Sequence, residues 1–536
     1  MKNVAILNEA ADPQPRVAHC KLRFLCVWGA VLLCCAVTGC VVGPKYHAPV
    51  TQAPTAYKEA PSPQQPQSTN TGTWTVAQPQ DAMLRGNWWE VFHEPELNAL
   101  EEQLNINNQN IKLYFENFME ARALIREARS QYFPTVSTGP SWQRSRSSAN
   151  LRNAYTATGS NGGGTVSGNV VSSGQQTSIY SLPLDITWAP DIWGKVRNEV
   201  RTYQYSAQVS AADLENERLT EQITLAEYFF EIRGQDALIH LYAATVEADK
   251  NALQFTQTQY ETGVGDKISV VQAQATLQTA ESNATNLGVL RAQYEHAIAV
   301  LVGKQASDFS IPVRPLTTAP PPIPIGLPSQ LLQRRPDIAA AERTMAAANA
   351  EVGIAEAAYY PDLTLSATGG FESSTFKHLF DWPSRFWSIG PSVSETIYDG
   401  GLRRATVHQY VAVYNADLAN YRQTVLTAFE QVENYLAEVR ILSQQIQQQQ
   451  QAVASDQAAL DLEMARYQTG MDPYINVVTL QTTLLVGQQT LANLQIEQMT
   501  GAVALVGSLG GGWDTSQLPT PSQVEKSPSV AETKIQ

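Results

Sequence analysis

The side chains that most often perform chemistry are scattered along this chain. No cysteine follows Cys40 to serve as a nucleophile. Gly162-Gly-Gly164 lacks the Lys and Ser or Thr of a phosphate-binding loop, so a surface loop is expected. The pattern predicts a protein that is not an enzyme, binds no cofactor and works through its shape. The histidines after Cys40 match no metal-ligand spacing: His47, His93, His240, His296, His378 and His408.

Cys40 ends a segment typical of an export signal, residues 1–39. Lys21 and Arg23 precede an apolar run, Phe24 to Val37, that is too short for a comfortable membrane span. Val37-Thr-Gly-Cys40 resembles the lipobox of bacterial lipoproteins, whose cysteine becomes the lipidated first residue. We expect Cys40 to carry lipid; a signal cleaved elsewhere is the alternative. The other cysteines all precede it, so no disulfide is expected: Cys20, Cys26, Cys34 and Cys35.

The composition is acidic. The chain has a formal charge of −14, and without residues 1–39 it has 32 basic and 48 acidic side chains. Such a balance argues against nucleic-acid binding. No apolar run after the signal approaches the length of a membrane helix, so any crossing of a membrane would use strands.

Two long stretches repeat each other, and each keeps a seven-residue apolar period up to a Tyr-x-Thr-Gly turn. A strict period of seven predicts helices that pack along continuous seams. No proline interrupts Lys195 to Tyr260 or Leu402 to Tyr467, so each stretch is expected to be one helix of about 100 Å. The heptad positions are Leu225, Ile232, Ile239, Val246, Leu253 and Tyr260, and then Leu418, Val425, Val432, Val439, Ile446, Val453, Leu460 and Tyr467.

Each half also contains a predicted pair of strands. In the first half the period changes towards two after Pro134, and Ser178 to Trp188 alternates. In the second half the segments beginning at Leu363 and Trp387 place apolar residues on one face, including Ile397. Ser160 to Gly174 and Glu372 to Arg385 are expected loops. Four strands cannot close a barrel, and open edges are not tolerated in lipid, so two or three copies would have to join.

The predicted fold class is therefore α+β: an internally duplicated chain with a long α-helical coiled-coil barrel and a transmembrane β-barrel built from four strands per protomer. The expected segments are a signal peptide (1–39), a lipidated tether (40–94), a first repeat (95–311), a Pro-rich linker (312–328), a second repeat (329–512) and a flexible tail (513–536).

Four motifs resemble the outer-membrane efflux proteins of Gram-negative bacteria, in the lipoprotein branch of the TolC/OprM-like family. The resemblance implies a homotrimeric exit duct of a tripartite pump, lipid-anchored in the outer membrane and extending into the periplasm. It also implies a periplasmic membrane-fusion adaptor and an inner-membrane transporter of the RND type as partners. The motifs are Val42 to Tyr46, Trp88 to Phe92 with Pro95 to Asn98, Leu327 to Ile338 with Ala341-Glu342, and Tyr398 to Arg403.

The same resemblance places the periplasmic aperture at the two helical turns. Arg466 and Tyr467 match a pair that holds the closed state in the family. Some relatives add an acidic residue where this chain has Gln272 and Thr479. Asp266 and Asp472 are substitute candidates, with helix capping as the alternative. The candidate aperture residues are Tyr260, Gly263, Asp266, Arg466, Tyr467, Gly470 and Asp472.

A lipid-anchored periplasmic coiled-coil adaptor without a pore is the alternative function. Heptads and a tether fit both functions, whereas paired strands with aromatic faces favour the duct.

Overall fold

The computed structural model describes residues 41–49, 53–54, 56–59, 86–146, 152–157, 166–171, 176–316, 318–323 and 328–526. The predicted signal peptide and Cys40 lie outside these residues. The chain forms two compact units, each built from both sequence halves. Unit 1 comprises Met1–Tyr46, Arg126–Thr202 and Asn349–Ala412, and unit 2 comprises His47–Ile125, Tyr203–Ala348 and Val413–Gln536.

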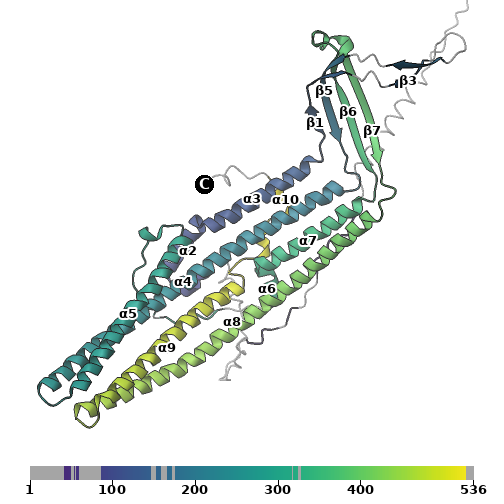
Figure 1. Cartoon of the computed structure of the whole chain (residues 1–536). Helices are drawn as coiled ribbons and strands as arrows, with labels where there is room; N and C mark the ends of the chain where they lie inside the picture. Colours follow the sequence, from purple (N-terminus) through teal and green to yellow (C-terminus); the bar gives the residue numbers. More distant parts are fainter. Residues whose placement is uncertain are drawn as a thin grey trace, which may run out of the picture. The chain divides into compact units, whose positions relative to one another are not determined.

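The helices repeat in matching lengths, which confirms the internal duplication (Figure 1). Helices α4 (Lys195–Glu261) and α8 (Leu402–Gln468) each have 67 residues, within one residue at each end of the expected bounds. Helices α5 (Lys267–Leu301) and α9 (Tyr474–Ser508) each have 35 residues. The shorter helices are α2 (Pro95–Asn107), α3 (Gln109–Ser130), α6 (Pro328–Arg334), α7 (Pro336–Ala357) and α10 (Pro521–Glu525).

In the part of the chain that the structure describes, no helix is both long enough and apolar enough to span a membrane.

The heptad seam of α8 packs as predicted, since none of its eight positions is exposed. The seam of α4 differs at its end, because Tyr260 is 48% exposed. One apolar core in unit 2 combines α4, α8 and α9, with Phe229, Val432 and Val503 at its centre. Burial of each such side chain is worth about 1.5–3 kcal/mol, so the seams provide most of the adhesion between the long helices.

Parts of the expected tether and tail make defined contacts where the structure describes them. In unit 1, the Val42 amide donates to the Trp193 carbonyl (3.0 Å) and the Asn198 side chain donates to the Val42 carbonyl (2.9 Å). In unit 2, the 3-10 helix η2 (Trp88–Phe92) buries both tryptophans. Near the C-terminus, Trp513 and Val524 are buried. These segments are fixed because they carry apolar side chains or backbone partners that composition alone does not reveal.

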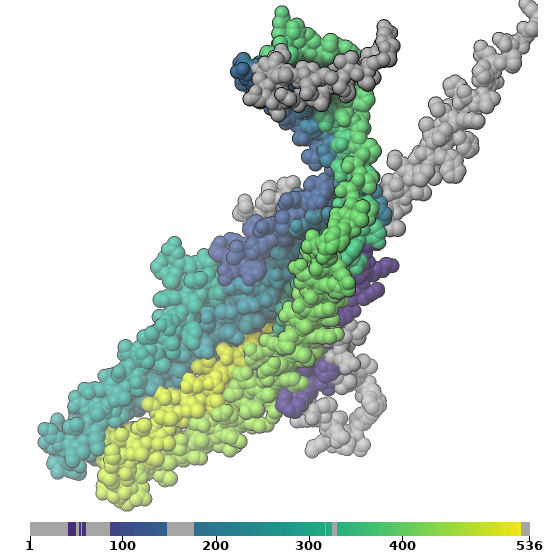
Figure 2. Space-filling model, turned by 45° about the vertical axis from the view of Figure 1, so that its right-hand side comes forward, coloured from purple at the N-terminus to yellow at the C-terminus, as the bar shows by residue number. Residues whose placement is uncertain are grey.

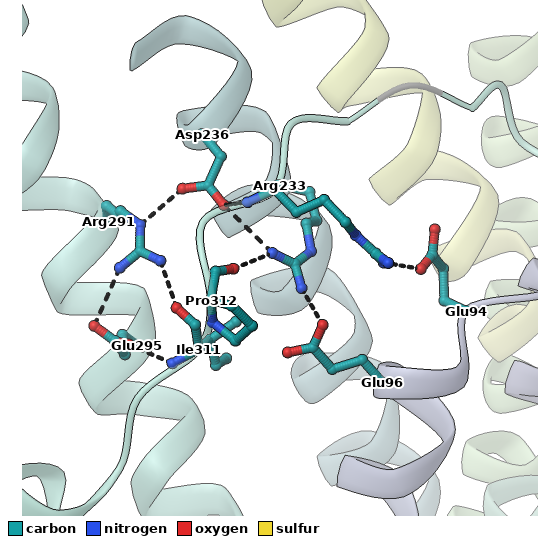
Figure 3. Close-up of polar contacts among 9 residues, drawn as sticks. Glu94, Glu96, Arg233, Asp236, Arg291, Glu295, Ile311 and Pro312 are labelled. Carbon is teal, nitrogen blue, oxygen red and sulfur yellow. Dashed lines mark hydrogen bonds and ion pairs between the residues drawn. The ribbon is translucent and has the colours of Figure 1, made fainter. Parts of the chain in front are cut away.

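A buried polar cluster on α4 holds the segment that joins the two halves (Figure 3). Asp236 has no exposed surface, and it pairs with Arg291 of α5 (2.7 Å) and with Arg233 (3.4 Å). The Arg314 amide donates to the same carboxylate (2.8 Å), and Arg233 donates to the Pro312 carbonyl (2.7 Å). The predicted Pro-rich linker is therefore fixed to unit 2 by hydrogen bonds along its first residues.

Unit 1 contains an antiparallel sheet in the order β1-β5-β6-β7, with β2 continuing beside β5 (Figure 1). Because β1 and β2 together flank one side of β5, the sheet has four strand positions, as predicted. A separate hairpin, β3 with β4, was not predicted, and β4 falls in the expected Ser160 to Gly174 loop. The bounds are β1 Thr135–Thr138, β2 Ser141–Arg146, β3 Arg152–Ala157, β4 Val166–Val171, β5 Gln176–Trp188, β6 Asp362–Ser373 and β7 Arg385–Ser394.

The register of this sheet separates apolar from polar side chains. Paired residues share a face, so the pairs Leu184 with Gly369 and Ile186 with Ala367 lie on one apolar face. Asp185 pairs with Thr368 on the other face, where their side chains are joined by a hydrogen bond (2.8 Å). Ile397 is a correction: β7 ends at Ser394, and Ile397 lies beyond the ladder, almost fully exposed.

Glu101 of α2 is a fully buried carboxyl, and neither oxygen has a hydrogen-bond partner among the described residues. Burial raises its pKa well above the usual value. A carboxyl with a raised folded pKa lowers stability progressively as pH rises above its unfolded pKa. The penalty is roughly 1.4 kcal/mol per pH unit until the folded pKa is reached.

We predict that Glu101→Gln raises the thermal midpoint of the detergent-solubilised protein at pH 8 relative to wild type. The gain should shrink towards pH 4, where the native carboxyl is protonated in both states. The neighbouring exposed residue provides a control, because Glu102→Gln should show no such pH-dependent difference. Equal pH profiles for Glu101→Gln and wild type would show that the buried carboxyl finds a polar partner.

Candidate functional site

The two turns between long helices have the same backbone geometry. Gly263 and Gly470 have φ values of +76° and +74°, a region that disfavours side chains. After each helix a backbone hydrogen bond closes the turn. The Val264 amide donates to the Gln259 carbonyl (2.9 Å), and the Met471 amide donates to the Arg466 carbonyl (3.0 Å). The predicted glycines therefore terminate α4 and α8. Figure 2 shows the two turns side by side at one end of unit 2.

The tyrosines that end the two heptad series have different environments. Tyr467 is only 9% exposed, and its hydroxyl donates to the Gln259 side chain of α4 (2.6 Å). Its ring contacts Phe255 of α4 edge-on, with centroids 6.0 Å apart. Tyr260 is half-exposed. Tyr467 thus joins the two hairpins of one chain, whereas its repeat counterpart does not.

An apolar cluster surrounds Tyr467. The Tyr474 ring lies 5.2 Å from it, and Ala273 of α5 and Val477 of α9 complete the buried part. Burial is the main cause that raises the pKa of Tyr474 to about 12, so this phenol is neutral at physiological pH. Residues from all four long helices therefore meet beside the turns.

The charged candidates make contacts within their own turns. Arg466 pairs with Asp472, and this carboxylate raises the pKa of the arginine further. Asp266 accepts a hydrogen bond from the Ser269 amide (2.7 Å) and caps α5. Its pKa is lowered, chiefly by that bond. Asp472 does not cap α9, since the cap residue is Pro473.

The interhelical contact is thus aromatic and neutral. A hydrogen bond of this kind contributes about 0.5–1.5 kcal/mol, and an aromatic pair contributes a similar amount. Gln259, Phe255 and Tyr474 were not predicted as site residues. Their signal in the sequence is weak. Tyr474 could be noticed because it stands across the turn from Tyr467, but no pattern marks Gln259 or Phe255. Thr479 donates to the Ile475 carbonyl (2.8 Å) and has no charge to offer a latch.

The described fold combines two repeated long helical hairpins with an antiparallel sheet that has one apolar face. Residues 100–304 and 327–511 each match the family described as "Outer membrane efflux protein". Each matched range contains one pair of long helices, α4 with α5 and α8 with α9. The chain belongs to the outer membrane efflux protein family, whose members are channel proteins rather than enzymes.

Similar proteins cover nearly the whole chain. The antibiotic efflux pump outer membrane protein ArpC of Pseudomonas putida is 31% identical over 92% of this chain and 98% of its own length. The toluene efflux pump outer membrane protein TtgC, also of Pseudomonas putida, is 30% identical with the same coverage. The solved outer-membrane channel OprN is 27% identical, with a TM-score of 0.74 over 88% of this chain and all of its own. This chain is accordingly an outer-membrane efflux channel protein that extends into the periplasm.

We predict that Tyr467→Phe accelerates amide hydrogen exchange at the end of α4 by about 2- to 12-fold, corresponding to loss of one hydrogen bond. The ring and its packing are retained, so assembly should be unchanged. The repeat counterpart serves as the control: Tyr260→Phe should leave exchange unaltered. Equal exchange in both variants would mean that the Gln259 contact contributes nothing to closure of the turns.

Proposed function

We propose that this chain is the exit duct of a tripartite efflux pump and acts as a homotrimer. It would work with a periplasmic membrane-fusion adaptor and an inner-membrane transporter of the RND type. The pore-free adaptor alternative is disfavoured, because the family consists of channels. The observation that carries the proposal is the one-sided sheet of unit 1, since such an apolar face suits contact with lipid.

The open edges of the sheet are the reason for proposing that several copies of the chain assemble. Its outer strands, β1 with β2 on one side and β7 on the other, are unpaired on their outer edges within the described part of one chain. Each unpaired backbone group in hydrocarbon costs several kcal/mol, so neighbouring copies would pair these edges. Strand counting allows two or three copies, and the family resemblance selects three.

Cys40 is proposed as the lipid attachment site. The residues directly after it are held in unit 1, where Gly43 lies so close to Gly353 that a Cβ would be 2.6 Å from its Cα. Asn349 also donates to the Pro44 carbonyl (3.0 Å). A lipid on Cys40 would therefore be close to a fixed part of the chain rather than at the end of a long free tether.

The aperture is proposed at the two turns, with Tyr467 as the main contact between hairpins. Arg466 and Asp472 would stabilise the α8–α9 turn itself, and Asp266 the start of α5. Opening would require the Tyr467 contacts to separate while the Gly263 and Gly470 turns stay intact. The contacts are individually weak, which suits a gate that a partner protein opens.

The cargo is proposed to be drugs or other small toxic compounds. Relatives of nearly equal similarity are named for antibiotic and for toluene efflux. A duct of this family serves whatever its pump delivers, so selection would rest mainly on the inner-membrane transporter.

We predict that Arg466→Ala with Tyr467→Ala raises single-channel conductance at least about twofold and admits vancomycin into cells, because both turn and interhelical contacts are lost. Tyr467→Ala alone should produce most of the effect, and Arg466→Ala alone little. The measurement is planar-bilayer conductance together with vancomycin sensitivity. Unchanged conductance in the double variant would place closure elsewhere, and absence of any conductance in wild type would refute the duct.

We predict that Leu184→Arg lowers the yield of assembled trimer, because a cation on a lipid-facing strand costs about 2–4 kcal/mol near the bilayer midplane. Asp185→Arg lies one residue away on the polar face and should be much milder. Multi-angle light scattering in mild detergent measures both. A well-folded monomer for wild type, or equal losses for the two variants, would contradict the assignment of the apolar face.

A further inference from the structure

A cavity of about 370 Å³ lies among α4, α5 and α9 in unit 2. Its wall combines neutral polar side chains, such as Thr279 and Gln489, with apolar ones, such as Ala280 and Leu485. Asp249 is the one carboxylate among its lining residues, and they include no Lys, Arg or His. An ionised Asp249 therefore gives the cavity a single uncompensated negative charge.

Asp249 is buried without full compensation. It is 4% exposed, and its Oδ2 atom has no hydrogen-bond partner among the described residues. A second lining residue, Gln481 of α9, has an equally buried Oε1 atom without a partner in the same part of the chain. Two acceptors from different helices thus share one cavity, and buried acceptors of this kind normally bind a donor.

The threonines of the wall have already used their hydrogens. Each hydroxyl has one proton, which here goes to a backbone carbonyl of its own helix. Thr279 donates to Ala275 (2.9 Å) and Thr482 donates to Val478 (2.8 Å). Thr245 and Thr276 donate in the same way to Leu241 and Gln272. Their remaining lone pairs can only accept, so these threonines suit a ligand that donates.

We propose that this cavity binds a primary alkylammonium ion. The ammonium group supplies one positive charge and three N–H donors, which match one carboxylate and neighbouring neutral oxygens. The alkyl part would lie against the alanine, leucine and valine side chains of the wall. The ligand contacts would come from α4, α5 and α9, so an occupied site links the two hairpins of the chain.

Metal ions fit less well. Within the described residues there is no group of three or more His, Cys, Asp or Glu side chains that could hold a metal ion. A bare monovalent ion would leave most of the cavity of about 370 Å³ unfilled, because even a water molecule takes up only about 30 Å³ in the liquid. A hydrated potassium ion is the remaining inorganic occupant, and competition by potassium chloride separates it from the ammonium compound.

The site is tested with the full-length trimer in detergent and ethylammonium chloride as the probe, by saturation-transfer NMR of the ligand. Wild type should give a saturable signal that Asp249→Asn reduces at least about tenfold, as expected for loss of a charge-assisted contact. Tetramethylammonium has the same charge and no N–H donor, so it should give little signal. Potassium chloride at equal concentration should not displace ethylammonium.

Two further variants keep the test independent of folding at Asp249. Gln481→Leu and the isosteric Thr279→Val each remove one acceptor and should weaken binding severalfold. Asp461→Asn removes a carboxylate from an exposed position of α8 and serves as the matched control, with no change expected.

No signal with wild type would overturn the proposal, as would an equal signal in Asp249→Asn and wild type. Equal binding of tetramethylammonium, or displacement by potassium, would replace it with a simple cation site. These results do not depend on conductance, so the channel proposal stands or falls separately.

Discussion

The buried carboxylate of Asp236 is the interaction on which the arrangement of unit 2 depends. It lies on a helix that also has to present an apolar seam, and removing a charge from water costs several kcal/mol. Two arginines and a backbone amide compensate this charge. One of those partners belongs to α5 and another to the segment after the first repeat, so a single side chain adds polar contacts to the apolar packing between these elements.

The continuation of that cluster joins further elements of the first repeat to α4 and α5. Arg233 also pairs with Glu96 of α2, and Arg291 pairs with Glu295 and donates to the Ile311 carbonyl. Ile311, Pro312 and Arg314, where the chain leaves the first repeat, are thus held by α4 and α5.

Duplication produced equal helices but unequal sites. The lengths of α4 and α8 agree, and both turns use a glycine with positive φ. Yet one tyrosine is buried against the other hairpin and its counterpart faces outward, and one aspartate caps a helix while the other pairs with an arginine. The two hairpins therefore do not contact each other through equivalent residues.

The sequence by itself determined the repeated helices, the two turns, the one-sided strands and the family. These follow from local rules: period, absence of proline, glycine at a left-handed position and alternation along a strand. Only the tertiary structure decided that Tyr467 rather than Tyr260 joins the hairpins, that Asp472 pairs with Arg466, and that the segments after Cys40 and around Trp513 are packed. Most of those outcomes depend on contacts between residues far apart in the sequence, such as Gln259 with Tyr467, which no local pattern specifies. The pairing of Asp472 with Arg466 is local, but it depends on how the side chains lie in the turn, which the sequence pattern does not specify either.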